Sequence, residues 1–123
     1  MEVIMENKML ISKLALMYGV SRSTLLYYDK IGLLVPSHDK DTGYRYYSEK
    51  DKETLELIII LRETGLSLKG IKEFLNCPTH LYNINLLQLK KIELQQKISE
   101  LQQIECTLEK KILQLKSIKN KAH

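Results

Sequence analysis

The chain has 123 residues and a formal net charge of +4, with 19 basic and 15 acidic side chains. This length suits a small head with an extension and is too short for a head joined to a large ligand-binding domain. The charge excess lies in residues 76–123, with eight lysines against four glutamates, so the total says little about DNA. Residues 8–47, however, carry six basic against three acidic side chains, which favours a nucleic-acid partner there.

Three histidines, His38, His80 and His123, lie far apart, and no nucleophile–base or paired-carboxylate spacing occurs. The sequence therefore predicts that the chain is not an enzyme. No apolar run reaches the length of a membrane span, and no signal peptide precedes Cys77 and Cys106, which we expect to be reduced thiols. These features predict a cytoplasmic protein that needs no cofactor.

The first predicted feature is a helix-turn-helix. In ISKLALMY (11–18), apolar residues recur at i, i+3, i+4 and i+7, as on one face of a short helix. Gly19 suits a left-handed cap that ends this helix, and Ser21 suits the N-cap of the next one, on which Leu25 and Tyr28 face inward. The second helix of such a pair enters a DNA major groove. Taken alone, the pattern also fits an αα corner in any helical domain.

Residues 36–47 (PSHDKDTGYRYY) favour a DNA-binding helix-turn-helix over an αα corner. The DTG turn and the aromatic run after it predict a β-hairpin wing, to which residues 9–11 add a short strand. Tyrosine offers a donor for phosphate and an apolar ring for sugar, and arginine adds a fixed charge. Tyr27, Arg45 and Tyr47 are therefore candidates for DNA contact, although tyrosine rings also fit the core of such a domain.

Four stretches, in this order and spacing, resemble the MerR family of bacterial transcription regulators: YGVS, TLLYYDKIGLL, DTGYRYYS and LRETGLSLKGIKEFL, within about residues 9–75. The resemblance implies a winged helix-turn-helix head and a homodimer that binds and distorts double-stranded promoter DNA. It also implies RNA polymerase as a partner, at the bacterial nucleoid. Leu26 departs from the family, which usually has arginine before the paired aromatics. A charged contact or ion pair is therefore missing at that position.

Two more helices complete the predicted head. Ser48 and Asp51 form a capping box before a helix that is apolar nearly all round, as expected at the centre of a core. Gly65 ends this helix, and Ser67 caps a fourth one. Lys69 lies in the first turns of the fourth helix, where exposed backbone N–H groups suit a phosphate.

The head ends at Asn76-Cys77-Pro78, because proline cannot continue a helix. We therefore divide the chain into a lead-in (1–8), a DNA-binding head (9–77) and a long dimerisation helix (78–123). The predicted fold is mainly α-helical, a winged helix-turn-helix head with a small β-hairpin wing followed by one long coiled-coil helix.

From about residue 81 to 119 the chain has no proline or glycine, and leucine recurs every seventh residue. This register predicts a coiled coil with a second copy of the chain, because one head cannot cover a helix of roughly 58 Å. In a parallel pair, Lys91 and Glu105 would each face their own copies, which is unfavourable. An antiparallel pair centred near Leu101 separates both, in agreement with the dimerisation helix of the family. The predicted seam comprises Ile84, Leu87, Leu94, Ile98, Leu101, Leu108, Ile112 and Leu115.

The leading hypothesis is a homodimeric, sequence-specific transcription regulator that acts by distorting promoter DNA. The second helix would lie in the major groove, with Arg22, Ser23 and Thr24 nearest the bases. The full set of DNA-binding candidates is Ser21, Arg22, Ser23, Thr24, Tyr27, Tyr28, Arg45, Tyr47 and Lys69.

Other functions stay open at this point. An architectural or recombination-accessory protein would bend DNA without an effector, and a helical adaptor would bind protein with the head, although the tyrosine–arginine wing argues against an adaptor. A metal or thiol sensor would use Cys77 and His80, whose spacing suits two ligands, with His123 of an antiparallel partner as a third. The simpler interpretation of Cys77 is a small apolar stop before Pro78, and we predict no tight metal site.

Overall fold

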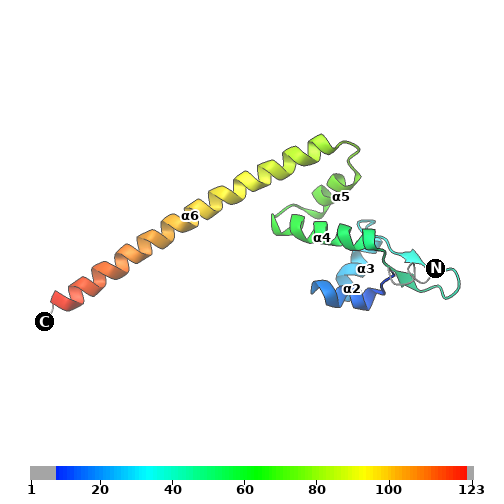
Figure 1. The fold of residues 1–123 in the computed structure, drawn as a ribbon, viewed down its shortest axis with the longest axis horizontal. Helices are drawn as coiled ribbons and strands as arrows, with labels where there is room; N and C mark the ends of the chain where they lie inside the picture. Colours follow the sequence, from blue (N-terminus) through cyan, green and yellow to red (C-terminus); the bar gives the residue numbers. More distant parts are fainter. Residues whose placement is uncertain (1–7, 122–123) are drawn as a thin grey trace. The chain divides into compact units, whose positions relative to one another are not determined.

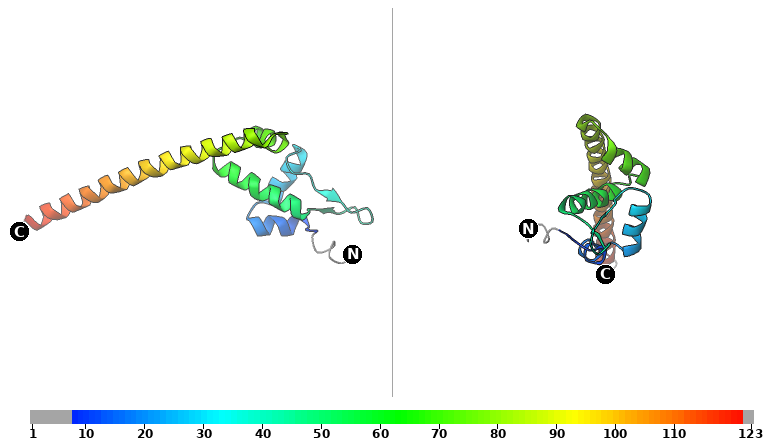
Figure 2. Two further views of the ribbon diagram at one scale, coloured as in Figure 1. Left: turned by 45° about the horizontal axis from the view of Figure 1, so that its top comes forward. Right: turned by 90° about the vertical axis from the view of Figure 1, so that its right-hand side faces the viewer.

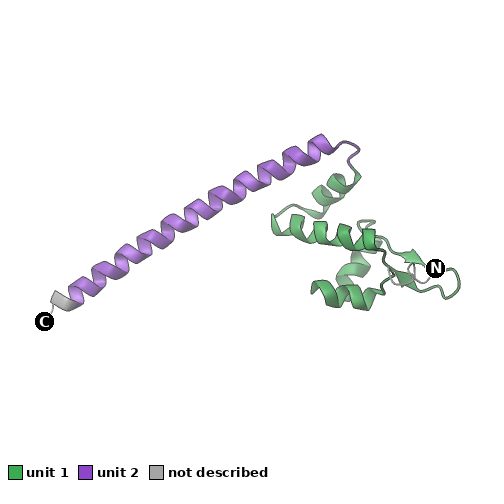
Figure 3. Cartoon of the chain, in the orientation of Figure 1, with its two compact units in different colours: residues 1–76 green, residues 77–123 purple. Residues whose placement is uncertain are grey.

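The computed structural model describes residues 8–121 and is mainly α-helical (Figure 1). It consists of two compact units, residues 1–76 and residues 77–123 (Figure 3). Most of the predicted lead-in, residues 1–7, lies outside the described residues. The elements in chain order are α2 (Ile11–Tyr18), α3 (Arg22–Lys30), β1 (Ser37–His38), β2 (Arg45–Tyr46), α4 (Glu49–Glu63), α5 (Leu68–Asn76) and α6 (His80–Lys121).

The predicted start and stop signals of the helices in unit 1 are confirmed. Gly19 ends α2 with φ 64°, a left-handed conformation that glycine adopts without steric cost. The Ser21 hydroxyl accepts a hydrogen bond from the Thr24 N–H at 3.0 Å. At the start of α4, Ser48 and Asp51 form both bonds of the capping box, at 2.9 and 3.2 Å. Each cap satisfies backbone donors that the helix cannot, so these residues determine where α3 and α4 begin.

The core of unit 1 draws side chains from all four of its described helices, α2 to α5. Helix α4 lies at the centre, as its apolar sequence predicts, because Leu55, Ile58 and Leu61 are fully buried along one face. Leu57 and Ile59 are half-buried beside them. Burying a side chain of this size stabilises the fold by roughly 1.5–3 kcal/mol. The side chains with essentially no exposed surface are Leu14, Leu25, Tyr47, Leu55, Ile58, Leu61 and Ile71.

Strands β1 and β2 form the predicted antiparallel wing, with Ser37 opposite Tyr46 and His38 opposite Arg45. The hairpin projects from the helices of unit 1 (Figures 1 and 2). The prediction of a third strand over residues 9–11 is wrong beyond its first residue. Met9 forms a single antiparallel bridge with Tyr47, and α2 already begins at residue 11, because its N-cap is residue 10.

The described part of unit 2 contains one helix, α6 (His80–Lys121), whose 42 residues span about 63 Å. All eight predicted seam side chains are exposed in the single chain, from 40% for Leu87 to 65% for Leu101. A helix of this length does not cover its own apolar face. None of the helices that the structure describes is long and apolar enough to cross a membrane.

Candidate nucleic-acid interface

Helix α3 presents one face to solvent and one face to the core. Successive residues are rotated by about 100°, so its exposed side chains fall within a sector of about 140°. These side chains are Arg22, Ser23, Leu26, Tyr27 and Lys30. Leu25 and Tyr28 lie on the other side and are buried. This division suits a recognition helix, which must be held by its scaffold and still enter a groove.

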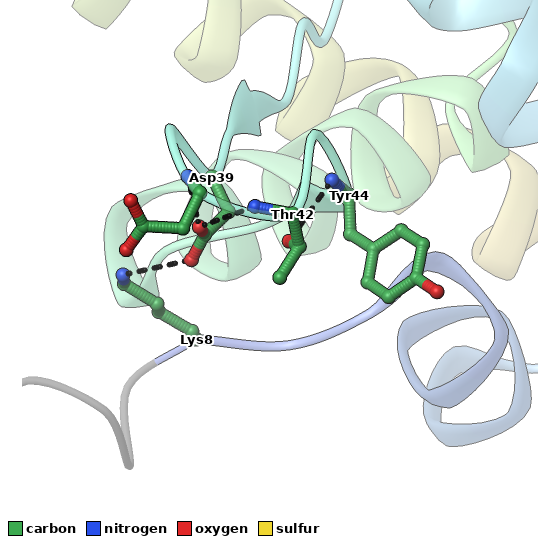
Figure 4. Close-up of polar contacts among 5 residues, drawn as sticks. Lys8, Asp39, Thr42 and Tyr44 are labelled. Carbon is green, nitrogen blue, oxygen red and sulfur yellow. Dashed lines mark hydrogen bonds and ion pairs between the residues drawn. The ribbon is translucent and has the colours of Figure 1, made fainter.

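The turn of the wing is shaped by one carboxylate (Figure 4). Asp39 Oδ1 accepts hydrogen bonds from the N–H groups of Asp41 at 2.8 Å and Thr42 at 3.1 Å. Asp39 Oδ2 lies 3.9 Å from Lys8 Nζ, and Thr42 Oγ1 accepts a bond from the Tyr44 N–H at 3.2 Å. The two backbone bonds, helped by the Lys8 charge, lower the pKa of Asp39 below its usual value. The ionised carboxylate thus fixes the turn that leads into β2.

An ion pair joins the wing to α3. Arg45 Nη1 lies 3.2 Å from Asp29 Oδ2, with 43% of the arginine side chain and 21% of the aspartate side chain exposed. No feature of the sequence indicated this pair, because its partners are distant in the chain and meet only in the fold. A guanidinium has five N–H donors, so one carboxylate oxygen leaves donors for a phosphate. The ion pair therefore orients the Arg45 side chain and leaves several of its N–H groups free to donate hydrogen bonds.

Helix α3, the start of α2 and the wing surround a hollow of about 390 Å³. Among the described residues, the lining carries two arginines, Arg22 and Arg45, and no carboxylate. The rest of the lining is apolar or neutral and includes Leu26 and Tyr44. The hollow therefore combines positive charge with an apolar wall, a combination that suits the edge of a nucleic acid better than an apolar ligand.

Two lysines of α5 have different environments. Lys72 Nζ donates a hydrogen bond to the Ile31 carbonyl at 2.8 Å, just past the C-terminus of α3, where a cation is favourable. Lys69 lies in the first turn of α5 and is exposed. Ser67 caps that helix by accepting a bond from the Gly70 N–H at 3.0 Å. Lys72 thus stabilises the head, and Lys69 is available to a partner.

Two of the predicted DNA-contacting side chains are buried, and we correct the prediction for them. Tyr47 has no exposed surface, and Tyr28 is only 8% exposed. Burial raises the pKa of Tyr47, and among the described residues its hydroxyl has no hydrogen-bond partner. Tyr47 does not reach the surface and Tyr28 barely reaches it, so both are core residues. The other candidates are exposed, apart from the half-buried Thr24.

The cysteine–histidine pair at the junction has local contacts. Cys77 Sγ lies 3.4 Å from the Thr79 carbonyl oxygen, and His80 begins α6. Within residues 8–121, no three histidine, cysteine or acidic side chains lie together as a metal ion would require. His123, the third ligand considered from the sequence, lies outside the described residues.

Comparisons with known proteins bear on this interface. Residues 9–76 match the family described as MerR HTH family regulatory protein, and residues 52–111 match the one described as MerR, DNA binding. The multidrug-efflux transporter 2 regulator of Bacillus subtilis (strain 168) is 40% identical over 93 residues, which cover 76% of this chain and 34% of that protein. Another curated relative from the same organism is covered over 54% of its length. The chain therefore spans between a third and just over half of these two relatives.

Solved structures agree with this match. MtaN, the N-terminus of the Bacillus subtilis multidrug transporter activator, has a TM-score of 0.62 and 36% identity, covering 85% of this chain and 97% of that one. HiNmlR, a MerR family regulator lacking the sensor domain, has a TM-score of 0.68 and 32% identity, covering 78% and 76%, and its structure is bound to promoter DNA. These matches confirm the winged helix-turn-helix fold and the resemblance read from the sequence. The chain belongs to the MerR family of helix-turn-helix regulatory proteins.

Proposed function

We propose that the chain is a homodimeric, sequence-specific transcription regulator that binds promoter DNA and distorts it. One observation carries the proposal: the exposed face of α3 and Arg45 of the wing meet around one hollow that contains two arginines. The promoter DNA bound to HiNmlR supports the same class of partner here. RNA polymerase as a second partner, and the bacterial cytoplasm at the nucleoid as the location, belong to this proposal. It includes no enzymatic step.

In this proposal the start of α3 contacts the bases, and other residues of the head contact the phosphates. Arg22, at the N-terminal end of α3, contacts base edges, because arginine binds guanine with two hydrogen bonds. Ser21, Ser23 and Thr24 lie beside it, although Ser21 also holds the helix cap. The phosphate contacts come from Tyr27, Arg45 and Lys69. These contacts fix the register of the protein on the duplex and carry no base information.

The dimer is proposed from α6. Its seam side chains are 40–65% exposed, and an apolar stripe of five heptads needs a second helix to cover it. In an antiparallel pair centred at Leu101, Glu105 lies nearest Lys97 of the partner subunit, so a like-charge contact becomes an opposite-charge contact. Lys91 lies nearest Lys111 of the partner subunit, a like-charge contact at the flank of the seam. The opposite-charge contact between Glu105 and Lys97 of the partner subunit, near the centre of the seam, favours the antiparallel arrangement.

Cysteine crosslinking tests the orientation. In a background with Cys77→Ser and Cys106→Ser, Leu101→Cys should crosslink to its own copy, and Leu87→Cys should not. A mixture of Leu87→Cys and Leu115→Cys should crosslink, because these positions face each other across the antiparallel centre. Efficient self-crosslinking of Leu87→Cys would show that the helices are parallel.

Binding to duplex DNA tests the function itself. A duplex selected from a random pool by the full-length chain should bind roughly 10³-fold or more tightly than a scrambled duplex of equal length. Affinity for both duplexes should fall steeply as salt rises, because phosphate contacts release counterions. Equal affinity for the two duplexes at every salt concentration would contradict sequence-specific binding.

A further inference from the structure

We propose that Leu26 is a specificity-determining residue and that it contacts the C5-methyl group of a thymine in the major groove. The inference rests on the proposed DNA-binding function and names one chemical group that the site recognises. The family usually has arginine at this position, whereas here the side chain of Leu26 lines the hollow beside α3.

Leu26 lies inside the exposed sector of α3 rather than at its edge. With about 100° between successive residues, Leu26 is about 40° from Arg22 on one side and about 40° from Lys30 on the other. It is 41% exposed, whereas its neighbour Leu25 is fully buried. A surface that meets both charged side chains therefore also meets Leu26.

Among the groups that bases expose in the major groove, one suits contact with an apolar leucine side chain. Leucine has no donor or acceptor, and polar base edges held against it would lose water without gaining a hydrogen bond. The one apolar group that the bases present in this groove is the methyl group at C5 of thymine. The same group occurs on 5-methylcytosine, so the shared chemistry is a pyrimidine C5-methyl.

The hollow beside α3 supports this assignment. Leu26 shares the lining with Leu10, Tyr44 and two arginines. A methyl group that enters there is covered by apolar atoms, while the guanidinium of Arg22 stays near the base edges and that of Arg45 near the wing. Arg22 and Leu26 are one turn apart, about 6 Å along the axis, against a base-pair rise of about 3.4 Å. The thymine therefore lies one or two base pairs from the pair that Arg22 contacts.

Replacing thymine by deoxyuridine removes the methyl group alone and provides the test. A high-affinity duplex is first selected from a random pool with the wild-type chain, and its thymines are then replaced one at a time. At one position in each half-site, deoxyuridine should weaken wild-type binding by about fourfold, the effect of burying one methyl group. Leu26→Ala should bind the thymine and deoxyuridine duplexes equally. At the same position, 5-methylcytosine should bind the wild type more tightly than cytosine.

Two variants serve as controls. Leu26→Met keeps the volume and the apolar surface and should keep the discrimination. Leu16→Ala makes the same truncation as Leu26→Ala on α2, at a side chain that is 85% exposed, and should behave as wild type. Circular dichroism should show the same helical content for all variants.

The outcomes separate this inference from the proposed function. If no sequence is enriched from the pool, the proposed function itself is overturned. If a sequence is enriched and the wild type binds all its deoxyuridine variants equally well, DNA recognition stands and the role of Leu26 is overturned. A deoxyuridine effect that persists unchanged in Leu26→Ala also overturns it, because another residue would then contact the methyl group.

Discussion

The two units of the chain use the same kind of apolar pattern in different ways. In the head, leucines and isoleucines at helical spacing, such as Leu55 and Ile58, are fully buried by other helices of the same unit. In α6, the heptad leucines are all at least 40% exposed, including Leu101 at the centre. The difference lies in what covers the apolar face. The head completes its own core, whereas we propose that a second chain covers α6. A substitution in the core should therefore destabilise the head without dissociating the dimer, and a substitution in the seam should dissociate the dimer without unfolding the head.

Leu101→Glu should have the largest effect, because it places two carboxylates at the centre of the proposed seam. We expect the variant to be monomeric at concentrations where the wild type is a dimer, while the head stays folded. Sedimentation measures the mass, and circular dichroism measures the remaining helix. Gln103→Glu, which adds the same charge outside the seam, should stay dimeric. A dimer unchanged by Leu101→Glu would contradict the coiled-coil interpretation.

Leu55→Ala tests whether the head is stabilised by its own core. Removing a fully buried leucine leaves a cavity, so the free energy of unfolding of the head should fall by roughly 2–5 kcal/mol. Urea denaturation of the full-length chain measures this loss, and sedimentation under native conditions should still find a dimer. The exposed Leu16→Ala should change stability by no more than about 0.5 kcal/mol. Equal losses for the two variants would show that the head has no such core.

The parts of the fold that depend on local sequence were predictable. Gly19 at a helix end and Ser48 at a helix start act through their own backbone neighbours, and the structure confirms both. The contacts that depend on tertiary packing were not predictable. Tyr47 is amphipathic, so its sequence context fitted either the core or the DNA surface, and only the fold places it inside. The Arg45–Asp29 pair likewise joins residues 16 positions apart across two elements.

Arg22→Ala should reduce sequence preference rather than binding in general. If Arg22 makes a bidentate contact with guanine, its loss should cost roughly 1–3 kcal/mol of discrimination at one base pair in each half-site. The effect is measured as the affinity for four duplexes that differ only in the base pair at that position. Lys30→Ala, which removes another positive charge from the same face of α3, serves as the control. Equal loss on selected and random DNA would mean that Arg22 contacts phosphate only.

Arg45→Ala should weaken binding about equally on all sequences, and Tyr27→Phe should do so more weakly, because backbone contacts carry no base information. The slope of log affinity against log salt should fall in magnitude by about one for Arg45→Ala. This variant also leaves Asp29 without its ion-pair partner near the duplex. Asp29→Asn in the same chain should therefore restore part of the affinity, and no recovery would show that the pair does not affect binding.

Tyr47→Phe should have the smallest effect. It removes a buried hydroxyl that has no partner among the described residues, so the head should keep its stability or gain up to about 1 kcal/mol, and DNA affinity should not change. Burial disfavours the ionised phenolate and raises the pKa of Tyr47 above its ordinary value of 10, so the folded state loses stability as pH rises above 10. The variant should therefore lose less stability than the wild type at alkaline pH. If Tyr47→Phe lowered DNA affinity without changing stability, the result would show that the Tyr47 hydroxyl contacts DNA.

Footprinting on the promoter of its own gene tests the central claim most directly, with the wild type beside Leu101→Glu at equal concentration. We predict that the wild type protects one two-fold symmetric region of two half-sites, with enhanced cleavage at a distorted centre, and that Leu101→Glu gives no protection. A single asymmetric footprint that Leu101→Glu leaves unchanged would contradict the account, because one head would then bind DNA without the dimer.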